Sequence, residues 1–177
     1  MKTRTKEEFR LNCVVEDLCG ILDRLRGHHD ALFDLLVEKQ SALTQVRMPD
    51  IADCTAREEA LLRTIIEEEQ ERLLVTEEIG DLLDHEYPAG IRVADMLPHL
   101  RDETASLLSR ARDALRDVAV RLARQNAVNR GLIEHSIGHV QLFMSRLAES
   151  ELRAKSYGDK GAREAGGDRP YLMDKRG

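Results

Sequence analysis

The chain has 177 residues and a net charge of −6; 34% of its residues are charged and only 3% are aromatic. This length suits one domain, or one domain with a tail. The negative charge disfavours a nucleic-acid-binding protein, because such proteins neutralise phosphates with a basic surface. Leu, Ala, Glu and Arg dominate, which is typical of long helices and coiled coils.

The first predicted helix spans about residues 5–47. From Leu11 to Val46, apolar side chains recur at alternating steps of four and three, interrupted only at His29 and Lys39. Further apolar side chains, among them Ile21 and Leu35, widen this stripe enough to face two neighbouring helices. We expect Met48-Pro49 to stop the helix, because proline disfavours a helical conformation in the residue before it.

The second predicted helix spans about residues 51–85, with Asp50 or Asp53 as its N-cap. Residues 57–86 contain 11 acidic residues and three arginines, whereas residues 100–130 contain seven arginines and four acidic residues. We interpret these segments as solvated faces of neighbouring helices with complementary charge. The sequence Tyr87-Pro88-Ala89-Gly90 predicts a break after the second helix.

The third predicted helix spans about residues 95–155, with Asp95 as N-cap and Pro98 in its first turn. Its apolar stripe is interrupted midway by Gln125 and Asn129, beside the helix-weakening Gly131. One interpretation is that the carboxamides keep a binding face soluble and in register. The other is that they are buried and fix the register of the bundle, as single asparagines do in coiled coils.

These elements predict an all-α fold: an elongated antiparallel three-helix bundle over residues 1–155 and a disordered tail over residues 156–177. Five of the 11 glycines fall in those last 22 residues, where the periodicity ends. At 1.5 Å per residue, the third helix is longer than its neighbours and either overhangs them or bends near residues 125–131. An apolar face near its end is then poorly covered, which marks an interaction site.

The sequence predicts no catalytic residue, no cofactor and no metal site. His135 and His139 share a helix face, but the glutamate of an HExxH motif is missing and no third ligand is evident. The glutamates of residues 67–71 are expected to be solvated. The three cysteines have no CxxC spacing and the first ten residues are polar, so we expect a reduced protein of the cytoplasm without a signal peptide or membrane span.

Five segments resemble the FlgN family of flagellar export chaperones. The stretch Asn126-Ala127-Val128-Asn129-Arg130-Gly131-Leu132-Ile133 is similar to an N-x-x-N-x-x-L-[LI] stretch in the family's last helix. Residues 35–43 and the segments 57–62 and 71–74 are similar to its first and second helices, and Tyr157-Gly158 to its closing tyrosine-glycine run. The likeness covers most of residues 10–160, whereas residues 1–10 and the chain after Gly161 depart from the family.

The resemblance implies a cytoplasmic chaperone that binds the amphipathic termini of hook-filament junction (hook-associated) proteins. It would prevent their premature assembly and deliver them to the type III export apparatus, whose export-gate or ATPase components are further candidate partners. A client helix would lie on the exposed apolar face of the last helix. The residues expected to contact it are Asn126, Asn129, Leu132, Ile133, Val140, Phe143 and Leu147.

Two other functions remain open from the sequence. One is a structural coiled-coil or adaptor protein that self-associates through the same apolar face and has no role in export. The other is a metal protein or enzyme that uses His135 and His139. A stable homodimer would favour the first, and stoichiometric metal the second.

Overall fold

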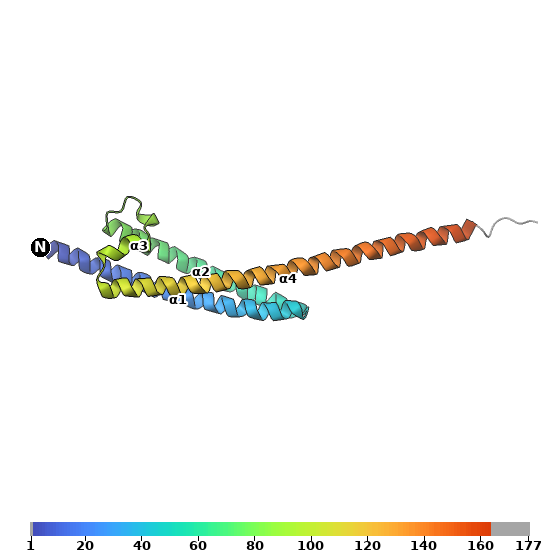
Figure 1. Cartoon of the computed structure of the whole chain (residues 1–177), viewed down its shortest axis with the longest axis horizontal. Helices are drawn as coiled ribbons and strands as arrows, with labels where there is room; N and C mark the ends of the chain where they lie inside the picture. Colours follow the sequence, from blue (N-terminus) through green and yellow to red (C-terminus); the bar gives the residue numbers. More distant parts are fainter. Residues whose placement is uncertain (1, 164–177) are drawn as a thin grey trace, which may run out of the picture. The chain divides into compact units, whose positions relative to one another are not determined.

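The computed structural model describes the backbone of residues 2–163 and the side chains of residues 6–150. This part contains helices and turns and no strand, which confirms the predicted all-α class (Figure 1). Four α-helices and two short 3-10 helices follow one another: α1 (Lys2–Thr44), α2 (Met48–Leu82), η1 (Pro88–Gly90), α3 (Val93–Met96), η2 (Leu97–His99) and α4 (Asp102–Arg163).

The chain forms two compact units, Met1–Leu132 and Ile133–Gly177. The first holds α1, α2, the segment between α2 and α4, and the first half of α4. The described part of the second consists of helix alone, because α4 continues without a break to Arg163. The domain limits expected from the sequence, residues 1–155 and 156–177, stay a prediction.

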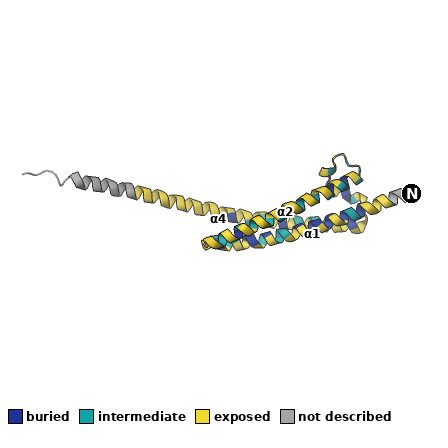
Figure 2. Cartoon of the chain, turned by 180° about the vertical axis from the view of Figure 1, so that it is seen from behind, coloured by how far each residue is buried: buried dark blue, intermediate teal, exposed yellow. Residues whose placement is uncertain are grey.

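Helix α1 supplies most of the core of the first unit. More than half of the buried apolar side chains that the structure describes lie on it. Leu18 and Leu22 pack in one cluster with Ile79 of α2 and Leu108 of α4, and Leu25 packs in a second cluster with Ile65 of α2. The wide apolar stripe of the first helix is thus buried against the other long helices, as Figure 2 shows.

Hydrogen bonds and ion pairs show the direction of the helices within this unit. Along α1, Arg10, Arg24 and Lys39 pair with Glu78, Glu68 and Glu58 of α2 in turn, so α1 and α2 are antiparallel. Toward α4, Asn12, Asp30 and Leu36 contact Arg101, Arg121 and Asn129 in turn, so α1 and α4 run in the same direction.

The turn between α1 and α2 begins earlier than expected. Helix α1 ends at Thr44, where the Arg47 N–H donates to the Ala42 carbonyl at 3.0 Å and the Val46 N–H to the Leu43 carbonyl at 3.2 Å. This is the Schellman arrangement, and Val46 has the left-handed φ of 53° that it requires. Pro49 lies in the first turn of α2, so Asp50 and Asp53 lie inside the helix, and their predicted role as N-caps is wrong.

The predicted start of the last long helix is also wrong. Asp95 belongs to the separate helix α3, where its carboxylate accepts a hydrogen bond from the Arg92 N–H at 3.2 Å. Pro98 lies in η2, and Leu100 is extended, so the helix restarts only at Asp102. The Asn12 side-chain oxygen accepts the Arg101 N–H at 3.2 Å, and this contact from α1 holds the break in place.

At the other end, α4 continues past the predicted boundary. Residues 156–163 are helical, whereas their glycine content led us to expect disorder. Residues 164–177, the rest of the predicted tail, lie outside the described residues.

The three cysteines are free thiols in two environments. Cys19 and Cys54 are buried, whereas Cys13 is half-buried. Burial, with the nearby carboxylates of Asp23 and Glu16, raises the pKa of the Cys19 thiol from its ordinary value of 9.0 to about 11. Burial also raises the pKa of Cys54.

Replacing Val46 with glycine should stabilise the protein. A β-branched residue in the left-handed region costs roughly 1 kcal/mol that glycine does not. We therefore expect Val46→Gly to raise the free energy of unfolding by about that amount in urea denaturation followed by circular dichroism. As the matched control, Val37→Gly, at an exposed position within α1, should lower it. A loss of stability in Val46→Gly would contradict the assigned turn.

The raised pKa of Cys19 predicts slow labelling and a pH-dependent stability. At pH 8 a thiol reagent should modify Cys13 first, and Cys19 and Cys54 only after unfolding. Above pH 9 the Cys19 thiol ionises in the unfolded chain but keeps its proton in the folded one, so the free energy of unfolding should fall between pH 9 and about 11. In Cys19→Ala this part of the decrease should be absent. Equal labelling rates for all three native thiols would contradict the burial.

Candidate functional site

Every side chain described in the second unit, residues 133–150, is exposed (Figure 2). Seven of them are large and apolar: Ile133, Ile137, Val140, Leu142, Phe143, Met144 and Leu147. Val140 and Phe143 expose 61% and 62% of their surface. Isolated exposed apolar residues are ordinary, but so many within 18 positions indicate an interaction surface.

Five of these side chains form one stripe. Ile133, Ile137, Val140, Met144 and Leu147 follow one another at steps of four, three, four and three residues, which places them on one face of the helix. We call these five residues the apolar stripe. Phe143 borders it at the edge, whereas Leu142 lies on the opposite face, about 200° around the helix from Val140.

The site predicted from the sequence is divided between the two units. Ile133, Val140, Phe143 and Leu147 lie in the second unit and are exposed. Asn126, Asn129 and Leu132 lie in the first unit, where Asn126 is exposed and Leu132 is half-buried. The role of these seven residues in binding stays a prediction.

Asn129 is 2% exposed, and its side chain forms hydrogen bonds within the first unit. Its amide donates a hydrogen bond to the Leu36 carbonyl of α1 at 2.8 Å. The Gln125 amide donates to the Gln40 side-chain oxygen at 2.7 Å and more weakly to the Asn129 side-chain oxygen at 3.4 Å. This geometry fits the interpretation in which the two carboxamides fix the register of α4 against α1.

Ile137 and Met144 are stripe residues absent from the predicted site, although the signal was present in the sequence. The three-four spacing of apolar residues in α4 includes both positions. The predicted site instead followed the family-like motif, which ends at Ile133 and includes the polar positions before it. The spacing of apolar residues identifies all five residues of the apolar stripe, whereas the motif includes only Ile133.

His135 and His139 form a pair away from the apolar stripe. Their Nε2 atoms are 2.9 Å apart, and their rings meet edge to face with centroids at 4.4 Å. Both are exposed, and among the described residues no group of three His, Cys, Asp or Glu side chains is arranged to hold a metal ion. The pair by itself offers two ligands where zinc sites use three or four from the protein.

The Gln125–Asn129 network predicts a specific loss of stability. Asn129→Ala removes a buried amide and should lower the free energy of unfolding by about 1–2 kcal/mol in urea. The exposed neighbour Asn126 provides the matched control, and Asn126→Ala should change it by less than about 0.5 kcal/mol. Equal effects of the two substitutions would show that the buried amide contributes nothing.

None of the described helices is long and apolar enough to cross a membrane. A search of curated proteins and a search of solved structures found no match to this chain. The profile of one protein family, described as FlgN protein, matches residues 14–165. The match spans α1, α2, α3 and α4, including the whole apolar stripe. The chain therefore belongs to the FlgN family, a family of flagellar export chaperones.

Proposed function

We propose that this protein is a cytoplasmic chaperone for hook-associated proteins, the proteins of the hook-filament junction. It binds their amphipathic termini, prevents premature assembly and delivers them to the type III export apparatus. Membership of the FlgN family supports the flagellar role. The observation that carries the proposal further is the apolar stripe, which is exposed over its whole length.

A lone amphipathic helix is an incomplete structure. Isolated helices gain most of their stability from packing an apolar face, and the described part of the second unit offers no second element for this. A client helix with its own apolar stripe would complete the pair in the way that amphipathic helices bind grooves and coiled-coil partners. The client's assembly surface would then be covered while it is bound.

The packed helices of the first unit would serve as the stable body of the chaperone. Their core depends on α1, and the apolar stripe belongs to the second unit. Asn129 then acts inside the bundle and contributes to client binding only by positioning α4. Asn126 remains a candidate contact because its side chain is exposed.

Charge substitutions within the stripe should abolish client binding. Each buried aliphatic side chain contributes about 1.5–3 kcal/mol, so the double variant Val140→Glu/Met144→Glu should weaken binding at least roughly 100-fold. The measurement is fluorescence anisotropy with labelled terminal segments of the host's hook-associated proteins. Leu142→Glu is the control, because Leu142 is also a large, exposed apolar residue but lies on the opposite face. The affinity of this variant should remain near that of the unchanged protein.

Two results would contradict the proposal. One is equal affinity in the stripe variant and the Leu142 variant, which would separate client binding from the stripe. The other is failure to bind any hook-associated protein by a folded protein that elutes as a tight dimer and becomes monomeric in Val140→Glu/Met144→Glu. The second result would favour the self-associating adaptor.

A further inference from the structure

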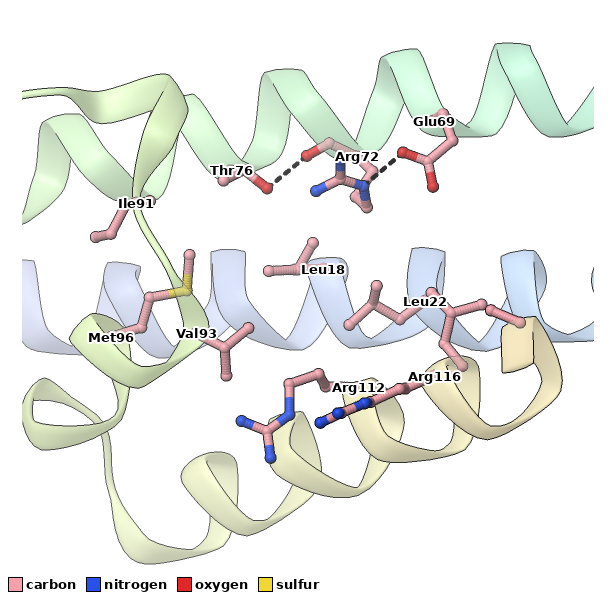
Figure 3. Close-up of a pocket in the computed structure, with 12 residues that line it drawn as sticks. Leu18, Leu22, Glu69, Arg72, Thr76, Ile91, Val93, Met96, Arg112 and Arg116 are labelled. Carbon is pink, nitrogen blue, oxygen red and sulfur yellow. Dashed lines mark hydrogen bonds and ion pairs between the residues drawn. The ribbon is translucent and has the colours of Figure 1, made fainter. Parts of the chain in front are cut away.

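A groove lies in the first unit between α2 and α4, far along the chain from the apolar stripe. Leu18 and Leu22 of α1 lie along its base (Figure 3), and Leu115 of α4 also lines it. Ile91, Val93 and Met96, from the segment before α4, close one end. The groove has a volume of about 330 Å³, room for two or three side chains of a partner.

The borders of the groove are polar and mostly basic. Arg72, Glu69 and Thr76 line it from α2, and Arg112 and Arg116 from α4; α1 contributes no charged group. In Figure 3, Arg72 and Arg112 approach the base of the groove from opposite sides.

The charges at these borders are only partly neutralised. The Arg72 Nε atom is 2.7 Å from the Glu69 carboxylate, and Arg112 is 2.8 Å from the exposed carboxylate of Asp113. Arg116 is exposed and has no acidic group beside it among the residues that line the groove. The groove therefore carries an excess of positive charge over an apolar base.

The expected charge complementarity between α2 and α4 is absent at this place. Among residues 6–124, each ion pair that joins two helices has one partner on α1, where Arg10, Arg24 and Lys39 pair with four of the glutamates of α2. Arg112 and Arg116 thus line a groove whose other side, formed by α2, offers no carboxylate that is not already paired. Basic side chains around an apolar depression fit a ligand of opposite charge and matching apolar face.

We propose that this groove binds an acidic amphipathic helix of another protein. Arg112 and Arg116 are four residues apart on α4, so their side chains lie about 6 Å from each other on one helix face. Carboxylates four residues apart on a partner helix match that separation. Apolar side chains from the same partner face would cover Leu18 and Leu22, which makes this helix-in-groove recognition.

The binding site is separate from the stripe proposed for clients and does not depend on it. The groove lies within Met1–Leu132, and the stripe within Ile133–Gly177. Substitutions at one should leave the other unchanged, so the failure of either proposal is recognisable on its own.

A synthetic helix of defined chemistry tests the proposal with the full-length protein. The probe is a labelled helical peptide with leucines at a three-four spacing and glutamates at i and i+4 beside them; the control peptide carries glutamine at each glutamate. The glutamate peptide should bind at least roughly tenfold more tightly than the glutamine peptide, and added salt should reduce this difference.

Variants of the groove separate charge from shape. Arg112→Glu/Arg116→Glu should weaken the glutamate peptide roughly tenfold, and Arg112→Gln/Arg116→Gln by a smaller factor in the same direction. Ala119→Trp should weaken both peptides, because Ala119 lines the groove and a large ring would fill it. Arg110→Glu/Arg124→Glu is the matched control: it changes the charge of α4 by the same amount at two exposed positions that do not line the groove. Circular dichroism establishes that each variant is folded.

Three outcomes would overturn the proposal. Equal binding of the two peptides would show that the arginines select nothing. Equal effects of Arg110→Glu/Arg124→Glu and Arg112→Glu/Arg116→Glu would reduce the interaction to general electrostatic attraction. A dimer of the unchanged protein that dissociates in Arg112→Glu/Arg116→Glu would assign the groove to a second copy of this chain.

Discussion

The structure depends on one helix that packs against two others. Helix α1 is apolar on a wide face and supplies most of the described core, so α2 and the first half of α4 are both held by it. Helix α1 has 43 residues, whereas α4 has 62, of which residues 102–132 belong to the first unit. In the second unit the apolar spacing of α4 continues, and the described side chains there are exposed.

Polar side chains define both ends of the contact between α1 and α4. At one end, Asn12 of α1 is buried and accepts the Arg101 N–H just before α4 begins. At the other, Asn129 of α4 is buried and donates to the Leu36 carbonyl. Buried amides tolerate few alternative alignments, since a shift of one helix along the other would leave them without partners. The two asparagines therefore fix where packing starts and where the exposed face begins.

Periodicity was enough to predict the long helices, the wide stripe on α1 and an exposed face near the end of α4. It failed where a contact from elsewhere in the chain decides the local structure. Pro98 and Asp95 resemble an ordinary helix start, but Asn12, 89 residues away from Arg101, holds the chain extended there. The burial of Asn129 likewise depends on Leu36 and Gln40 of another helix, and the groove beside Arg112 is lined by residues of α1, α2, α4 and the segment before α4, which no local pattern brings together. Residues 156–163 are helical although glycine disfavours a helix, so local helix propensity alone does not predict their conformation.

The central claim is that the second unit presents an uncovered helix face that a client covers. Hydrogen–deuterium exchange of the backbone amides in residues 133–150, with and without a hook-associated protein, tests this most directly. We expect rapid exchange in the free protein and strong protection in the complex, while α1 and residues 102–132 exchange slowly in both states. Slow exchange of residues 133–150 in the free monomer, or exchange that the client leaves unchanged, would contradict the account.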